Sequence, residues 1–508
     1  MTTTSVEGER GNGDGVPNET ASPRAAGAAR ALPGAEDTIV AVATAPGRGA
    51  VALVRLSGPR AHAIAARVVR PWPDAARVVR RCAVHDPVTG ERVDEAVVTR
   101  YDAPRSYTGE DAVEISTHGG LAVPAAVVAA LVAAGAREAL PGEFTRRAVL
   151  NGKLDLVQAE AVGDLVDARS PAMRRAALSQ LDGGLSRRVA ALRDAVLEVE
   201  ALVAYDIDFP EEDDGPLPRA RVAATADALV TSLDALLATA PAGELVREGA
   251  VVVIAGAPNA GKSSLFNALV GEARAIVTDV PGTTRDAIEA VVDGGGFPLR
   301  LVDTAGLRET RDVVERIGVE VSERWLGRAQ VVLACGDGDE ALATAISRVV
   351  ALSGAPIVAA RTKVDLTDER GGPPTGELLA KDADPATAVS PDGPFGRAEA
   401  LVRVSAEAGE GLRDLLAAIG HVLAERYGAP GASEGAAPLV TRERHRRALA
   451  EAREEVAGFR AAWTEGALPA PVVAVHLRAA AHALEELIGV VDTEDVLGRV
   501  FSRFCVGK

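Results

Sequence analysis

The sequence predicts a multidomain protein that combines an α+β domain, an all-α domain and an α/β domain. Short apolar runs around a glycine-rich turn open the folded part, and a long helical repeat of apolar residues follows them. Apolar β-branched runs then alternate with helices, which is typical of a doubly wound parallel sheet. Because the chain ends in a second helical stretch, we expect the α/β domain to be inserted into one discontinuous helical domain.

The composition is that of a globular protein and excludes several classes of function. The 508 residues suggest about three domains. With 55 basic and 72 acidic residues, the formal charge of −17 gives no general attraction to nucleic acid or to an anionic membrane. The cysteines are too few for a disulfide framework, and no apolar run reaches the ~20 residues of a membrane helix. We therefore expect a cytoplasmic protein without a membrane segment.

The N-terminal part divides into an extension and an α+β domain. Residues 1–36 are rich in Gly, Ala, Pro and Thr, and we predict that they are disordered. The α+β domain is predicted over residues 37–153. Its predicted strands lie at 38–42, 51–56, 95–99 and 112–116, and its predicted helix lies at 122–134.

A helical domain is predicted over residues 154–246 and 429–508. In the first segment, six apolar residues alternate spacings of four and three, which places them on one helix face. We interpret this stripe as bundle core rather than as a cofactor site. Its members are Leu185, Val189, Leu192, Val196, Val199 and Val203.

The α/β domain is predicted over residues 247–428. A stretch rich in Pro, Gly and Asp at 369–397 is expected to be a solvated loop. The predicted strands of the parallel sheet are 251–255, 299–303, 331–334, 357–361 and 401–405.

A phosphate-binding loop is the strongest functional motif. Residues 256–263 match GxxxxGK[ST], and the motif follows a predicted strand and precedes a predicted helix, which is the context it requires. In such a loop the backbone N–H groups wrap the phosphates, Lys262 reaches the terminal phosphates, and the hydroxyl of Ser263 binds Mg²⁺. The predicted ligand is therefore a nucleoside triphosphate.

Three further motifs, each at the end of a predicted strand, indicate guanine as the base. At 303–306, an aspartate would hold Mg²⁺ through water, and a glycine N–H would sense the γ-phosphate. The Asp365 carboxylate would accept from N1 and the exocyclic amine of guanine, while the stem of Lys363 covers the base. A backbone N–H at 405–406 would read the guanine oxygen.

Two positions depart from the usual pattern of such proteins. Thr362 stands where an Asn amide usually tethers the phosphate loop, so we expect weaker guanine affinity without loss of specificity. Leu307 stands where Ras-like switches have a water-orienting Gln. Either hydrolysis is very slow or a carboxylate takes that role, and spacing alone does not distinguish Glu309 from Glu315.

Two more features bear on cations. Residues 278–286 have the hydroxyls, carbonyls and glycine of a switch that places one threonine on Mg²⁺, and Asn259 offers a carbonyl oxygen for a monovalent cation. Lysine is rare, with five among the 55 basic residues. Because arginine serves elsewhere as the general cation, Lys153 and Lys508 are candidates for a specific role.

With these motifs, the chain resembles the MnmE (TrmE) family of tRNA modification GTPases. The resemblance runs from residue 37 to residue 508. It is carried by the phosphate loop, Gly-Thr-Thr-Arg-Asp at 282–286, Asp-Thr-Ala-Gly-Leu-Arg at 303–308 and Phe-Ser-Arg-Phe-Cys-Val-Gly-Lys at 501–508. Further matching motifs lie at 37–41, 46–49, 107–111, 141–145, 151–156 and 207–212.

The resemblance implies a Ras-like P-loop GTPase domain and a homodimer whose N-terminal domains bind 5-formyl- or 5,10-methylene-tetrahydrofolate. It also implies a heterotetramer with MnmG, a partner that uses FAD and NADH. Together such proteins install an aminomethyl or carboxymethylaminomethyl group at C5 of the wobble uridine of certain tRNAs. The family's folate contacts match Arg55, Glu114, Lys153 and Lys508, which include both unexplained lysines.

The resemblance further implies stimulation of the GTPase by K⁺. The matching positions are Asn259, Thr278, Val280 and Thr283 for K⁺, Ser263 and Thr284 for Mg²⁺, and Glu315 for the carboxylate that orients water. The GTP-binding set, with Lys262 also catalytic, is Asn259, Ala260, Gly261, Lys262, Ser263, Ser264, Thr278, Asp279, Val280, Pro281, Gly282, Thr283, Thr284, Asp303, Thr304, Ala305, Gly306, Thr362, Lys363, Asp365, Ser405 and Ala406.

Some alternatives stay open. Cys505 either acts in the modification chemistry near the folate or is a small apolar residue packed beside Phe501 and Phe504. A regulatory RNA-binding GTPase, such as a ribosome-assembly factor, would need a basic C-terminal domain. Apart from the basic run at residues 442–447, the sequence has no such patch. A folate-dependent aminomethyl transferase with a vestigial GTPase domain conflicts with the intact set of Lys262, Ser263, Thr284 and Asp303.

Overall fold

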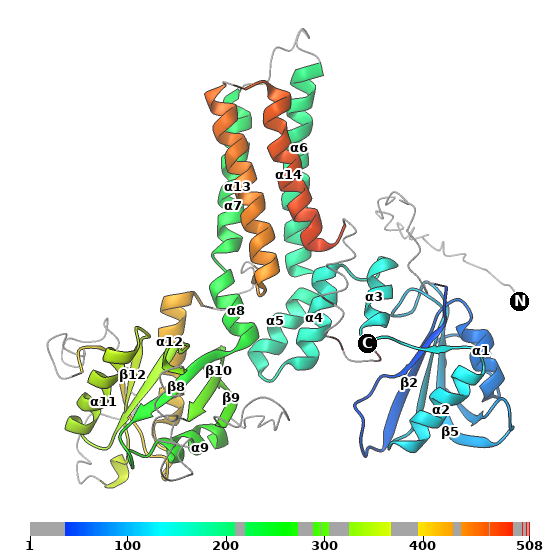
Figure 1. The fold of residues 1–508 in the computed structure, drawn as a ribbon, viewed down its shortest axis with the longest axis horizontal. Coiled ribbons are helices and arrows are strands. Elements are labelled where there is room, and N and C mark those ends of the chain that lie inside the picture. Colours follow the sequence, from blue (N-terminus) through cyan, green and yellow to red (C-terminus); the bar gives the residue numbers. More distant parts are fainter. Residues whose placement is uncertain are drawn as a thin grey trace, which may run out of the picture.

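The computed structural model of the chain confirms the predicted fold class. Two β-sheets stand on opposite sides of a helical region, and four long helices form a bundle that projects away from both sheets (Figure 1). The structure describes residues 36–208, 219–272, 288–294, 296–303, 325–366, 395–429, 438–466 and 468–490, together with residues 500, 504 and 507.

The N-terminal sheet has the strand order β3-β4-β5-β6-β2-β1-β7, and all neighbours are antiparallel except β1 and β7. Helices α1 (Ala61–Val68) and α2 (Ala122–Ala133) cover one face, where Ile64 and Leu131 join the core. The strands are β1 (Ile39–Val42), β2 (Val51–Ser57), β3 (Val69–Arg70), β4 (Arg80–His85), β5 (Arg92–Tyr101), β6 (Ala112–His118) and β7 (Arg137–Glu138).

The four strands and the helix predicted in this part are β1, β2, β5, β6 and α2. The elements α1, α3 (Glu143–Leu150), β3, β4 and β7 were not predicted from the sequence. Strand β4 begins with Arg80 and Arg81, which hide its alternation, and α1 is only eight residues long. Helix α3 follows β7, and its Phe144 packs with Ile39 on the face opposite to α1 and α2.

The helical part is built from two segments that are far apart in the chain. Helix α6 packs against α14, and α7 packs against α13. The predicted apolar stripe of α6 is confirmed as bundle core, since none of its six residues is more than 4% exposed. The helices are α4 (Leu156–Asp167), α5 (Pro171–Leu181), α6 (Gly184–Asp208), α7 (Arg219–Leu237), α8 (Ala240–Glu248), α13 (Glu443–Glu465) and α14 (Ala470–Ile488).

One helical stretch of the described residues, Arg219–Glu248, is long and apolar enough to cross a membrane by length and composition. This finding corrects the expectation that the sequence holds no such stretch. Val222, Leu229 and Leu233 of this stretch lie in the bundle core, where α7 packs against α13. Packing within the bundle therefore buries these apolar residues of α7.

The second sheet has the order β13-β12-β11-β8-β10-β9, and it is parallel except for β9, which pairs antiparallel with β10. The antiparallel strand β9 was not predicted. Helices α9 and α12 pack on one face and α11 on the other. The elements are β8 (Ala250–Gly256), α9 (Lys262–Glu272), β9 (Ile288–Gly294), β10 (Phe297–Asp303), β11 (Val331–Gly336), α11 (Asp339–Leu352), β12 (Ile357–Arg361), β13 (Ala398–Arg403) and α12 (Leu412–Tyr427).

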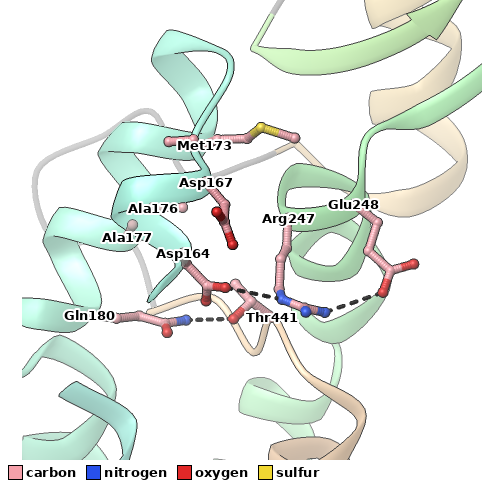
Figure 2. Close-up of a pocket in the computed structure, with 10 residues that line it drawn as sticks. Asp164, Asp167, Met173, Ala176, Ala177, Gln180, Arg247, Glu248 and Thr441 are labelled. Atoms are coloured by element: carbon pink, nitrogen blue, oxygen red, sulfur yellow. Dashed lines mark hydrogen bonds and ion pairs between the residues drawn. The ribbon is translucent and has the colours of Figure 1, made fainter. Parts of the chain in front are cut away.

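A polar joint connects this α/β part to the helical part. A cavity of about 130 Å³ lies between α4, α5 and α8, and Figure 2 shows Asp164 and Arg247 meeting beside it. The Asp164 carboxylate accepts from Arg247 Nε at 3.3 Å and from Arg442 Nη2 at 2.6 Å. Since α8 leads directly into β8, Asp164 links the strand of the phosphate loop to both segments of the helical part.

A buried ion cluster lies next to this joint. Glu160 accepts from His445 Nε2 at 2.7 Å and from Arg444 Nη2 at 3.0 Å, and both Glu160 and His445 are buried. Burial alone would raise the pKa of Glu160, but the hydrogen bond from His445 and the nearby arginines hold that pKa well below its usual range. Burial lowers the pKa of His445, so its neutral form donates to the Glu160 carboxylate.

Candidate functional site

The phosphate loop has the geometry that its motif predicts. It leaves β8 at Gly256 and enters α9 at Lys262, whose ammonium group donates to the carbonyl oxygens of Gly256 at 3.0 Å and Ala257 at 2.7 Å. The hydroxyl of Ser263 donates to the buried carboxylate of Asp303 at 2.7 Å. The lysine, the serine and the aspartate predicted to serve the phosphates therefore lie in one place.

Thr362 contacts the phosphate loop directly. Its hydroxyl donates to the carbonyl oxygen of Ala260 at 2.9 Å, and both residues are buried. A threonine hydroxyl thus makes the tether that an Asn amide makes in the usual motif. Because Thr362 makes this contact, the structure gives no physical reason for the weaker guanine affinity expected from the sequence.

The predicted base-binding residues meet at the ends of β12 and β13. The hydroxyl of Ser405 donates to Asp365 Oδ1 at 2.6 Å and so orients this carboxylate. The ammonium group of Lys363 lies 3.2 Å from Asp337 Oδ2, and Lys363 has a φ of +59°. The backbone N–H of Ser405 donates to Glu410 O at 3.1 Å, so it is already used within the loop.

The remaining phosphate-loop residues and Cys335 also have clear positions. Asn259 is exposed with a φ of +64°, while Ser263 and Ser264 are exposed in the first turn of α9. Cys335 is fully buried in β11, and burial raises the pKa of its thiol to about 12. Cys335 therefore belongs to the core of the α/β part.

Several predicted site residues lie outside the described part of the chain. They are Thr278, Asp279, Val280, Pro281, Gly282, Thr283, Thr284, Thr304, Ala305, Gly306, Leu307, Glu309, Glu315, Cys505 and Lys508.

A second site lies in the N-terminal sheet, where a cavity of about 340 Å³ brings together three predicted residues, Arg55, Glu114 and Lys153. Arg55 of β2 stands directly across from Glu114 of β6 in the strand register. Its Nε and Nη2 atoms both donate to Glu114 Oε1, at 3.0 and 2.8 Å. The strand pairing therefore fixes the position of Glu114, the one acidic residue that lines this cavity in the described part of the chain.

Two tyrosines complete the same wall. The Tyr101 hydroxyl donates to Glu114 Oε2 at 3.2 Å, and burial together with the Glu114 charge raises the pKa of Tyr101. The Arg55 guanidinium lies 5.1 Å from the centre of the Tyr107 ring, which places a cation over an aromatic face. The Tyr107 hydroxyl is hydrogen-bonded to Thr145 Oγ1 at 2.9 Å, and this bond fixes the orientation of the ring.

Lys153 reaches the cavity from the segment that joins α3 to α4. Its ammonium group donates to Pro104 O at 3.2 Å. Gly109 has a φ of +79°, and a Cβ there would lie 3.0 Å from Asn151 Cβ and 3.2 Å from Lys153 Cγ. The glycine therefore permits the close approach that brings Lys153 to the cavity.

The C-terminal end of the chain returns to the N-terminal sheet. A Cβ at Gly507 would collide with the carbonyl oxygen of Val42, the last residue of β1. Farther back, the ring of Phe504 packs near Gly163 of α4. The residue that precedes Lys508 thus lies against the strand next to β2, which carries Arg55.

Comparisons with known proteins match two long parts of the chain. Residues 156–505 match the family model described as the MnmE helical domain, and residues 38–153 match the model described as the GTP-binding protein TrmE N-terminus. A tRNA modification GTPase MnmE of Moorella thermoacetica is 42% identical over 93% of this chain and 100% of its own length. The chain belongs to the MnmE family. As a member of this family it is a GTP hydrolase.

Other MnmE relatives are similarly close. The MnmE protein of Methylorubrum populi is 43% identical over 94% of this chain and 99% of its own length. The MnmE protein of Aquifex aeolicus is 38% identical over 93% of this chain and 100% of its own length. Among solved structures, the G domain of the T. maritima FeoB iron transporter matches 35% of this chain and 98% of that chain, at 22% identity and a TM-score of 0.23.

The structure also reveals cavity residues that the sequence analysis missed. Tyr101, Tyr107, Arg77 and Arg105 line the cavity with the predicted residues. Arg77 and Arg105 lie in irregular segments with no strand or helix pattern around them, so no periodicity could reveal them. Tyr107 belongs to the matched motif at 107–111, which was the one available signal.

Proposed function

We propose that the protein is a K⁺-stimulated GTPase that couples GTP hydrolysis to the modification of wobble uridines in certain tRNAs. With MnmG, a partner that uses FAD and NADH, it would install an aminomethyl or carboxymethylaminomethyl group at C5 of the uridine. The one-carbon unit would come from a tetrahydrofolate derivative. The observation that carries this proposal is the presence in one chain of a phosphate loop and of a separate cavity where Arg55, Glu114 and Lys153 meet.

The GTP would bind over the phosphate loop with its guanine beside Asp365. Lys262 would hold the terminal phosphates, since its ammonium group already lies inside the loop. The Asp365 carboxylate, held by Ser405, would accept from N1 and the exocyclic amine of guanine. Because the N–H of Ser405 is bound to Glu410 O, the N–H of Ala406 would read the guanine oxygen.

The residues at the loop suit hard cations. The Ser263 hydroxyl and the Asp303 carboxylate lie in contact, and oxygen ligands of this kind are those that Mg²⁺ prefers. When bound, Mg²⁺ and K⁺ supply positive charge near the phosphates, as an arginine finger does in other GTPases. Glu315 would orient the attacking water. The proposed ligands are Ser263 and Thr284 for Mg²⁺, and Asn259, Thr278, Val280 and Thr283 for K⁺.

The folate derivative, 5-formyl- or 5,10-methylene-tetrahydrofolate, would bind in the N-terminal cavity. Glu114 would accept hydrogen bonds from the amino groups of the pterin, since it is the one carboxylate among the described residues that line the cavity. Lys153 and Lys508 would face the carboxylates of the glutamate tail. For Cys505 both roles stay proposals: it would either act in the modification chemistry or be a small packing residue.

The proposed assembly is a cytoplasmic homodimer that forms a heterotetramer with MnmG and binds tRNA. Closure of two GTPase domains across their nucleotide faces would activate hydrolysis. The proposed domains are 37–153, 154–246, 247–428 and 429–508, in which the second and fourth form one helical unit.

The alternative of a regulatory RNA-binding GTPase loses its main support. The four arginines of the basic run at 442–447 all lie in ion pairs, with Arg442 on Asp164, Arg444 on Glu160, and both Arg446 and Arg447 on Glu443. Arginines that are paired in this way offer little free charge to a phosphate backbone.

Three measurements test the proposal. GTP turnover should be fast in KCl and slow in NaCl at equal ionic strength, and equal rates would remove K⁺ from the mechanism. Glu315→Ala should bind GTP normally and lose turnover, whereas unchanged hydrolysis would remove Glu315 from the mechanism.

Deletion of Lys508 should weaken folate binding and leave GTP turnover intact, and normal folate affinity would reject the role of Lys508 in folate binding.

A further inference from the structure

The N-terminal cavity carries more positive charge than the proposed contacts to a simple folate account for. Among the residues that the structure describes, Arg55, Arg77, Arg105 and Lys153 line it, and Glu114 is the one acidic lining residue. Four cations against one carboxylate leave a net charge of +3. A cavity with this excess favours a ligand that carries several negative charges.

The charges are not spread evenly over the cavity. Arg55 and Glu114 are bound to each other through two hydrogen bonds to one carboxylate oxygen, so Arg55 already has its counterion. The same end is lined by Tyr101 and Tyr107. Aromatic walls and a held carboxylate suit a flat ring with amino groups. The cations that remain among the described lining residues are Arg77, Arg105 and Lys153.

Arg77 is held in an unusual backbone conformation beside this cavity. Its φ is +62°, which is uncommon for a residue other than glycine. Its backbone N–H donates to Arg100 O at 2.8 Å, and its Nη2 donates to Arg105 O at 3.1 Å. These contacts fix the segments of Arg77 and Arg105 against each other, and outliers that are held in this way concentrate at binding sites.

Both guanidinium groups are available to a ligand. The two arginines are exposed, and among the described residues neither forms an ion pair with a carboxylate. Arginine presents a planar fork of N–H donors that matches a carboxylate in two parallel hydrogen bonds. The pair therefore offers two carboxylate-binding positions beyond those of Lys153 and Lys508.

We propose that Arg77 and Arg105 bind the additional carboxylates of a poly-γ-glutamyl tail, so that the site prefers polyglutamylated folate. The inference rests on the proposed folate function of this cavity. A folate with one glutamate has two carboxylates in its tail, which Lys153 and Lys508 would match. Each further γ-linked glutamate adds one carboxylate, so two arginines correspond to a triglutamate.

The test compares two ligands on the full-length protein by titration calorimetry. The ligands are 5-formyl-tetrahydrofolate with one glutamate and the same compound with three. We expect the triglutamate to bind about tenfold more tightly at low salt, and this advantage should shrink as the salt concentration rises. The double variant Arg77→Gln/Arg105→Gln should bind the monoglutamate as the wild type does and lose the advantage for the triglutamate.

Two further variants control the measurement. Arg81→Gln removes an exposed arginine of β4 that does not line the cavity, and it should keep the full preference. Arg105→Gln alone leaves the backbone of Arg77 untouched and should lose part of the preference even where the double variant folds poorly. GTP turnover should stay at the wild-type level in all of them.

The outcomes separate this inference from the proposed function. Equal affinity of the wild type for the two ligands, or an unchanged preference in the variants, would overturn the role of Arg77 and Arg105 while leaving the folate site in place. If the wild type binds neither ligand, the folate function itself is wrong, and the tail preference is rejected with it.

Discussion

The hydroxyl of Thr362 donates a hydrogen bond to the backbone carbonyl oxygen of Ala260 over 2.9 Å. The two residues lie 102 positions apart in the chain, and both are almost fully buried. The bond ties the base-recognition motif to the phosphate loop. It shows that a threonine replaces the usual asparagine at this position without loss of the contact.

Replacing Thr362 by Val should weaken nucleotide binding. Valine has nearly the shape of threonine but leaves the buried Ala260 oxygen without its donor, which costs about 1–2 kcal/mol, or roughly a tenfold weaker affinity for GDP. Titration with a fluorescent GDP analogue measures this change. Thr362→Ser keeps the hydroxyl and should bind nearly as the wild type does. Unchanged affinity in Thr362→Val would mean that the tether has no role in binding.

Asp365→Asn should change the base preference. The amide that replaces the carboxylate cannot accept from both N1 and the amine of guanine, and two charge-assisted bonds at about 1.5–3 kcal/mol each predict at least a 100-fold loss of GTP affinity. Xanthine has a carbonyl in place of the amine, which an amide can match as a donor. Competition binding with GTP and XTP measures the switch, and a variant that still prefers GTP would place the base elsewhere.

Asp164→Asn should destabilise the joint between the α/β part and the helical part. The change weakens the hydrogen bonds to Arg247 and Arg442, and we expect a loss of about 1–2 kcal/mol in the free energy of unfolding. Urea unfolding measures it, and a double-mutant cycle with Arg247→Gln should show coupling. Glu248→Gln alters the exposed partner of Arg247 and serves as the control with little expected effect. Additive effects of Asp164 and Arg247 would show that the contact carries no energy.

The buried pair of His445 and Glu160 predicts a loss of stability in acid. Since burial lowers the pKa of His445, the unfolded chain takes up a proton near pH 6.5 that the folded chain does not. Stability should therefore be full above about pH 6.5 and fall below it, by at most about 1.4 kcal/mol per pH unit for this one group. The lowered pKa of Glu160 adds a further loss once the pH drops below about 4.3, the value in the unfolded chain.

Thermal unfolding between pH 8 and pH 5 measures this dependence. His445→Gln cannot take up the proton, so its melting temperature should vary less with pH than that of the wild type. His421→Gln changes an exposed histidine of α12 and should keep the wild-type profile. Parallel profiles of wild type and His445→Gln would show that His445 is not the titrating group.

The sequence predicted those parts of the two sites that depend on local patterns. The phosphate loop, Asp303 and Asp365 follow buried strands, and the parallel sheet brings the ends of such strands together. Other contacts depend on the folded chain alone. Arg442 donates to Asp164 across 278 positions of sequence. Arg77 lies in one loop and donates to the backbone of Arg105 in another. No periodicity or motif connects such residues before the strands and helices are placed.

Nucleoside analysis of wobble uridines, in cells that lack this protein and in the same cells supplied with its variants, tests the proposed function most directly. Cells without the protein should lack the aminomethyl-type group at C5, and the wild-type gene should restore it. Lys262→Ala, which removes the phosphate contact, and Glu114→Gln, which alters the cavity carboxylate, should each fail to restore it. Normal modification in cells that lack the protein would contradict the central claim, and full rescue by either variant would show that its site is not needed.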